Sequence, residues 1–80
     1  IMSLTLEQIA SQLDSDSTRD RMVALANLRY HSAAEAVPLI KKVLNDESLQ
    51  IRSMAVFALG IKQTDECYDL LINILETEKD

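Results

Sequence analysis

Apolar residues recur at helical spacing along the chain, in five stretches that short polar segments separate. Between residues 17 and 30, for example, Met22, Leu25 and Leu28 fall within one helical stripe, and the polar residues Arg21 and Arg29 flank it in the sequence. Stripes of this kind are typical of amphipathic helices that bury one side. The pattern predicts five helices, at residues 4–13, 17–30, 33–44, 48–61 and 65–77.

Polar residues that favour helix ends stand at the borders of these stretches. Ser32 is followed three residues later by Glu35, the spacing of a capping box, in which each side chain accepts a hydrogen bond from the other residue's backbone amide. Gly60 lies near the end of the fourth stretch, where glycine often closes a helix, and Thr64 is suited to start the fifth. Weaker boxes begin at Thr5 and Ser17.

The chain repeats itself with a period of 31 residues. Identical pairs under this shift include Ser17/Ser48, Arg21/Arg52, Ala24/Ala55, Leu28/Leu59, Glu35/Glu66, Leu39/Leu70 and Leu44/Leu75. A fixed period filled by two helices is typical of solenoids, in which each repeat packs on its neighbours. We therefore predict one all-α domain over residues 1–80, an α-α superhelix with a capping helix at 3–14, one repeat at 15–45 and a second at 46–77.

The two ends of this array differ in polarity. Gln8 and Gln12 of the first helix stand where Leu39 and Val43 stand in the third, so the first helix has the polar face that a solenoid end needs. The last helix is apolar on nearly all sides, as buried helices are, and Tyr68 takes a core-type position in it. We expect that the chain is a fragment of a longer solenoid, with self-association through the last helix as the next alternative.

Composition and charge exclude several classes of protein. One Gly, one Pro and three aromatic residues in 80 are too few for the turns and strands of an all-β fold. Eight basic against 13 acidic side chains give a net charge of −5, which argues against a nucleic-acid or anionic-membrane partner. There is no apolar run near the ~20 residues of a membrane span. Low cysteine use fits a reducing compartment, so we expect a cytoplasmic protein.

Residues that could carry chemistry are few. The single cysteine, Cys67, aligns with Ala36 and is expected to be a small buried thiol. The single histidine, His31, lies at a helix end and is expected to be a solvent-exposed surface or capping residue. A nucleophile with a neighbouring base is therefore not predicted, nor is a metal site built from histidines. We expect no catalytic, cofactor-binding or metal-binding residue, and no enzyme activity of the chain alone.

Residues 46–60 carry a recognisable motif, with an acidic turn at Asp46, an apolar residue followed by Arg52, and then Ala58-Leu59-Gly60. This motif resembles the short HEAT repeat, and residues 14–28 are a looser copy of it. The period is similar to that of the compact HEAT-like repeats called phycobilisome-lyase-type. The resemblance implies that Arg21, Asp46 and Arg52 are structural, with Asp46 paired to Arg52 and either Asp14 or Asp16 paired to Arg21.

The resemblance also implies a function in protein recognition. HEAT-like solenoids commonly bind partners on the concave face that their second helices line, which suggests a non-catalytic scaffold or adaptor. The alternative is a subunit or fragment of a bilin lyase system that attaches or detaches chromophores, and then the partner protein would be a phycobiliprotein. The outward positions of the second helices are Glu35, Lys41, Lys42, Asn45, Glu66, Asp69, Asn73 and Glu76. They form a mostly acidic stripe, which mildly favours a partner with a basic or polar patch.

Overall fold

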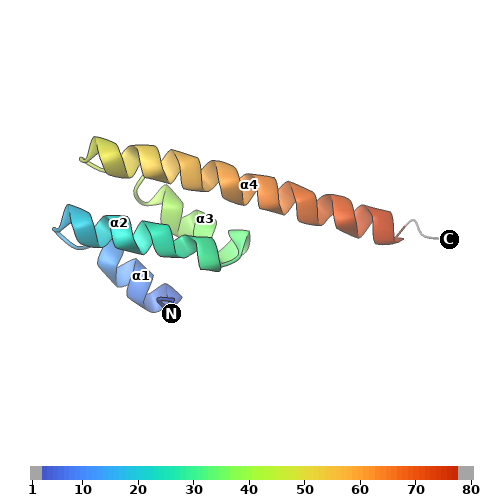
Figure 1. Cartoon of the computed structure of the whole chain (residues 1–80), viewed down its shortest axis with the longest axis horizontal. Helices are drawn as coiled ribbons and strands as arrows, with labels where there is room; N and C mark the ends of the chain where they lie inside the picture. Colours follow the sequence, from blue (N-terminus) through green and yellow to red (C-terminus); the bar gives the residue numbers. More distant parts are fainter. Residues whose placement is uncertain (1–2, 78–80) are drawn as a thin grey trace.

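The computed structural model describes residues 3–77 and consists of helices joined by short turns (Figure 1). The elements in chain order are α1 (Leu6–Leu13), α2 (Thr18–Asn27), the 3-10 helix η1 (Leu28–Tyr30), α3 (Ala33–Lys41) and α4 (Leu49–Thr77). No strand occurs within these described residues, so the predicted all-α class is confirmed. The second predicted helix is present, but its last turn tightens into η1, and the third ends three residues earlier than predicted.

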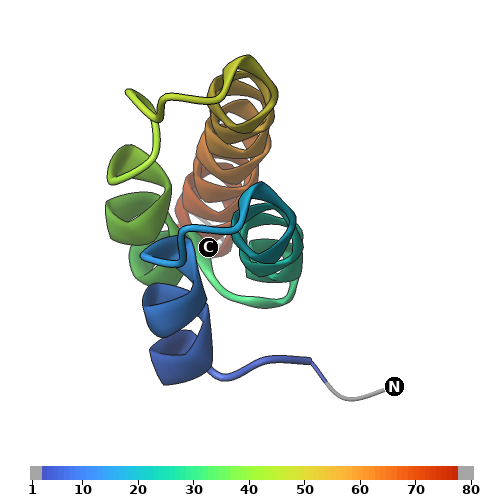
Figure 2. The same ribbon diagram turned by 90° about the vertical axis from the view of Figure 1, so that its left-hand side faces the viewer.

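The helices form two layers, which Figure 2 shows almost end-on. α1 and α3 lie one above the other in one layer, and α2 and α4 lie in the same way in the other. In Figure 1, α3 runs back along α2, and α4 then runs parallel to α2. The first repeat thus supplies one helix to each layer, as expected for a solenoid, and the second repeat adds α4 beside α2.

The core lies between the two layers and is entirely aliphatic. Its largest fully buried side chains are Ile9, Leu28, Ile40 and Ile51, which come from α1, η1, α3 and α4. The other buried residues of the same cluster are Leu13, Ala24, Leu25, Ala36, Val43 and Ala55. Every element contributes to one cluster, so the hydrophobic effect holds the repeats together as a single unit.

Two complete capping boxes define the starts of α1 and α3. The Ser32 hydroxyl accepts from the Glu35 amide at 3.3 Å, and the Glu35 carboxylate accepts from the Ser32 amide at 3.2 Å. Thr5 and Gln8 form the same reciprocal pair, at 3.1 and 2.9 Å. The predicted boxes at these two helix starts are therefore confirmed, and at α2 the Ser17 hydroxyl accepts from the amide of Asp20.

The predicted break between the fourth and fifth helices is wrong, because α4 is one continuous helix over Leu49–Thr77. Gly60 does not adopt a positive φ, and the Thr64 hydroxyl does not cap a new helix but donates to the Gly60 carbonyl at 2.9 Å, within the same helix. The repeat register explains the difference. Gln63 stands where the N-cap Ser32 stands in the first repeat, and glutamine is a good helix former and a poor cap.

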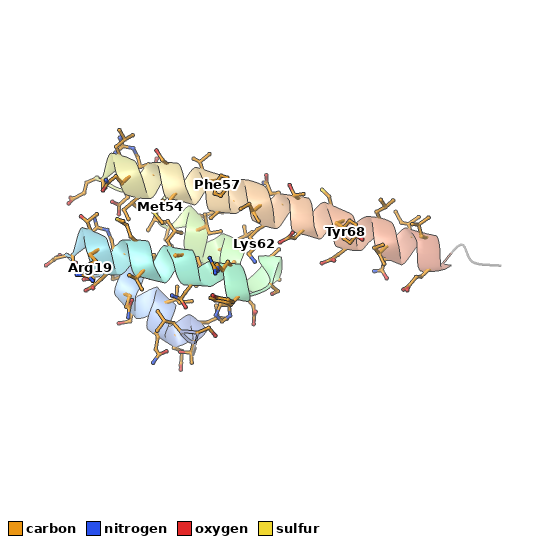
Figure 3. All side chains as sticks on the ribbon, viewed as in Figure 1. Arg19, Met54, Phe57, Lys62 and Tyr68 are labelled. Atoms are coloured by element: carbon orange, nitrogen blue, oxygen red, sulfur yellow. The ribbon has the colours of Figure 1, made fainter. Side chains whose placement is uncertain are left out.

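A continuous α4 carries its second half away from the rest of the protein, as the position of Tyr68 in Figure 3 shows. The protein is consequently elongated, with extents of 54 × 26 × 18 Å. Residues 65–77 are all exposed, Cys67 and Tyr68 included. The predictions that Cys67 is a buried thiol and that Tyr68 is a core residue are therefore wrong for this structure, because both depended on the helix folding back.

Candidate functional site

All eight residues predicted for partner binding are exposed, but they do not lie together. Glu66, Asp69 and Asn73 on α4 face the start of α3 across a shallow hollow of about 260 Å³. Its other lining residues are Ser32, Ala33, Ala34 and Leu70. Two carboxylates and an amide around one leucine are suited to a basic or polar group that also offers an apolar contact.

Four of the other predicted residues lie at or near α3 and are partly engaged within the chain, whereas Glu76 lies in the last turn of α4, outside the hollow. Lys41 ends α3, Asn45 lies in the following turn, and the Lys42 ammonium is 3.8 Å from the Asp14 carboxylate. Glu35, at the start of α3, is held by its capping box. The structure therefore does not gather the eight residues into one contiguous site, although Glu66, Asp69 and Asn73 do line one hollow.

A groove between α2 and α4 was not predicted from the sequence. Its volume is about 240 Å³, and its lining, mainly apolar, comes from α2, η1 and α4: Leu25, Ala26, Leu28, Arg29, Met54, Phe57, Ala58, Ile61 and Lys62. Phe57 is the only Phe of the chain and is mostly exposed at this groove (Figure 3). The repeat register could have indicated that Phe57 is exposed, because Phe57 corresponds to Ala26, which lies at an exposed position of α2.

The guanidinium of Arg21 is buried and joins the first repeat to the second. Its Nη1 donates to the Ser15 carbonyl at 2.8 Å, and its Nη2 donates to the Asp46 carboxylate at 3.1 Å. Its Nε is 3.0 Å from the other carboxylate oxygen but is not aligned for a hydrogen bond. The two side chains are only 7% and 11% exposed, so the ion pair is largely desolvated. Burial and geometry together make this pair structural.

The pairing differs from the one that the family resemblance implied. Arg52 donates to the backbone carbonyl of Asp46 at 2.9 Å, while the Asp46 carboxylate pairs with Arg21 of the preceding repeat. Neither Asp14 nor Asp16 pairs with Arg21. The carboxylate therefore links two repeats, because the stacking of α2 beside α4 brings Arg21 to the turn before α4.

The environment of Asp46 lowers the pKa of its carboxyl below the ordinary value of 3.8. Partial burial alone would raise this pKa, but interactions with three residues outweigh it. The Ser48 amide donates to the carboxylate at 2.9 Å, and the Arg21 guanidinium adds both a hydrogen bond and an opposite charge, with a further charge from Arg52. All three favour the ionised form.

This lowered pKa predicts a pH-dependent stability difference between the wild type and Asp46→Asn. A carboxylate with a lowered folded-state pKa contributes stability that is fully present above the unfolded pKa, near 3.9, and is lost as the pH falls through the folded-state value. The wild type should exceed Asp46→Asn in unfolding free energy at pH 7, and the difference should shrink below about pH 4. Urea unfolding at pH 7, 5 and 3 measures it. Asp16→Asn, at an exposed carboxylate, is the control, and a difference that does not change with pH would contradict the assignment.

The single histidine is more enclosed than predicted. His31 is partly buried, and its Nε2 is 2.9 Å from the Leu4 carbonyl, so it ties the segment before α1 to the end of η1. Its Nδ1 lies 3.9 Å from the Glu35 carboxylate. The prediction that His31 is solvent-exposed is therefore wrong, although its predicted place at a helix end is confirmed, since it is the C-cap residue of η1. Over residues 3–77, no group of three or more His, Cys, Asp and Glu side chains is placed to hold a metal ion.

Two layers of paired helices, a repeat of 31 residues and an arginine that links neighbouring repeats define an α-solenoid. The chain belongs to the HEAT-repeat family, since the family model described as HEAT repeats matches residues 6–80. Comparison with curated proteins and with solved structures gives no match. No helix in the described part of the chain has the length and apolar character needed to span a membrane.

Proposed function

We propose that this protein is a non-catalytic scaffold or adaptor that binds another protein. The observation that carries the proposal is the hollow in which Glu66, Asp69 and Asn73 of the second repeat face the start of α3 in the first. Repeat proteins commonly bind partners across surfaces that neighbouring repeats form together. A partner placed here would contact both repeats at once.

The charges around the hollow indicate the chemistry of the partner. Glu66 and Asp69 supply two carboxylates, and the whole chain has a net charge of −5. Opposite charge on a partner raises the rate of encounter and fixes orientation. Leu70 adds an apolar contact within the same hollow. A protein segment with lysine or arginine next to an apolar residue fits these groups best.

A narrower proposal is that the chain works within a bilin lyase system, with a phycobiliprotein as its partner. This narrower proposal is supported only by the sequence, namely by the similarity of the 31-residue period to that of phycobilisome-lyase-type repeats. No contact of the described residues favours it over a general scaffold. It is therefore the second alternative, and the experiment for the first also tests it.

Affinity capture tests both alternatives. The chain would be immobilised and exposed to a lysate of its source organism, and the retained proteins would be identified by mass spectrometry. We expect one protein, or one complex, to be retained specifically and to be competed by free chain. If that protein is a bilin-bearing light-harvesting protein, the narrower proposal is favoured. If nothing is retained beyond a heat-denatured control bait, the scaffold proposal is contradicted.

A further inference from the structure

The second half of α4 has the sequence of a packed helix but lies exposed. Under the 31-residue shift, residues 65–77 correspond to α3 and to the turn after it. Ile40 of α3 is 0% exposed, whereas its counterpart Leu71 is 52% exposed. The other two positions of this stretch that are buried in the first repeat show the same contrast. Ala36 and Val43 are buried, whereas their counterparts Cys67 and Ile74 are exposed. A face that the first repeat buries is thus uncovered in the second.

The surface that should receive this face is uncovered too. Leu25 of α2, in the first repeat, is 2% exposed, but its counterpart Val56 in α4 is 62% exposed. Two further pairs follow the same trend, since Leu28 and Leu13 are buried while their counterparts Leu59 and Leu44 are only partly buried. We call Val56, Leu59 and Leu44 the open seat. The repeat register makes the open seat and residues 65–77 complementary, because their counterparts belong to one buried cluster.

An intact α4 cannot place its own second half on this seat. In the first repeat the chain reverses because His31 and Ser32 leave the helix, with extended backbone, and Ser32 then caps α3. At the corresponding place α4 continues through Lys62 and Gln63. Lys62 is itself buried and donates from Nζ to the carbonyls of Arg29 and His31, which holds the first half of α4 against η1.

We propose that two copies of this chain exchange residues 65–77, so that this segment of each copy covers the open seat of the other. Within a repeat the two helices run in opposite directions, as α2 and α3 do in Figure 1. Two straight α4 helices, one from each copy, can lie antiparallel about a two-fold axis that passes near Gln63. The second half of each α4 then runs in the opposite direction along the first half of the other, as α3 does along α2. Such an exchange is a low-cost route to a closed, symmetric dimer. It goes beyond the proposed function and does not rest on it.

The polar side of the exchanged segment stays free in this dimer. Glu66, Asp69, Asn73 and Glu76 correspond to Glu35, Pro38, Lys42 and Asn45, which are exposed in the first repeat. The residues that become buried are Cys67, Leu71 and Ile74. Exchange therefore removes apolar surface from water without burying a charged side chain, which is the condition for a net favourable interface.

The test combines the mass of the particle with the reactivity of Cys67, the only thiol of the chain. Sedimentation equilibrium, with a reducing agent to prevent a disulfide, should give the mass of a dimer. After removal of the reducing agent, Cys67 should react with a thiol reagent at least about tenfold more slowly than in urea-unfolded chain, since a packed segment must open before it reacts.

Variants separate exchange from other kinds of association. The double variant Gln63→Ser/Thr64→Pro supplies an N-cap and a helix-breaking proline where the first repeat has its reversal. It should be a monomer in which Cys67 stays protected, because the segment can then cover its own seat. Leu71→Asp should be a monomer with a reactive thiol. Asn73→Asp, which adds the same charge on the polar side, should remain a dimer.

Three results would overturn the proposal. A wild-type monomer at every concentration excludes exchange, whether its thiol is protected or reactive. A wild-type dimer with a fully reactive Cys67 shows association through another surface. A dimer that persists in Gln63→Ser/Thr64→Pro shows that the association does not depend on a straight α4.

Discussion

Replacing Arg21 with methionine is expected to lower the free energy of unfolding by about 3 kcal/mol at pH 7, because removal of one partner leaves a desolvated carboxylate without its counter-ion. The loss should be this large since both side chains are largely buried and the Ser15 carbonyl also loses its donor. Urea unfolding at one fixed protein concentration measures it, so that any association does not alter the comparison.

Arg19→Met is the matched control, because Arg19 is exposed on the same helix. Its effect should stay within about 0.5 kcal/mol, as for most surface substitutions. If Arg21→Met and Arg19→Met were equally stable, the link between the two repeats would contribute nothing to stability. The stacking would then depend on the aliphatic core alone.

Ile40→Ala is expected to destabilise the protein by about 3 kcal/mol, within the range of 2–5 kcal/mol for large buried aliphatic residues. Ile40 is one of the largest fully buried side chains, and it lies in α3 within the cluster that every helix shares. Truncation removes its transfer free energy and leaves a cavity between the layers. A shift of the urea midpoint at constant slope measures the loss.

Ile61→Ala makes the same chemical change at a position that is 44% exposed. Its counterpart in the first repeat, Tyr30, is also exposed, so this position remains accessible even if residues 65–77 become covered. We expect a loss well below that of Ile40→Ala. Equal losses would show that the core is not centred between the two layers.

Much of the fold could be predicted because its signals are local and repeated. The 31-residue period predicts the order of the helices as far as the start of α4, and some identities within it mark positions with the same role in both repeats. Ala24 and Ala55 are both buried, and Arg21 and Arg52 each donate to a backbone carbonyl six residues earlier. The boxes at Thr5 and Ser32 involve residues three apart in the chain, so their hydrogen bonds follow directly from the sequence. The all-α class and the paired helices are thus determined by short-range patterns.

The remaining features depend on single substitutions within the repeat and on contacts between helices, which the repeat pattern alone does not show. The register predicted a reversal near residue 62, but a reversal also needs a cap, and Gln63 lacks the hydroxyl of Ser32. Asp46 was assigned to Arg52 because they share a motif, whereas stacking brings Arg21 closer to its carboxylate. The groove at Phe57 depends in the same way on two helices that lie far apart in sequence.

The affinity of the captured partner for the wild type and for Asp69→Lys is the most direct test of the proposed binding surface. Asp69 is exposed at the hollow between the two repeats, so reversing its charge should weaken binding at least about tenfold while leaving the unfolding free energy unchanged. Gln50→Lys, at an exposed position of α4 away from the hollow, should bind like the wild type. An unchanged dissociation constant for Asp69→Lys would contradict the assignment of this surface.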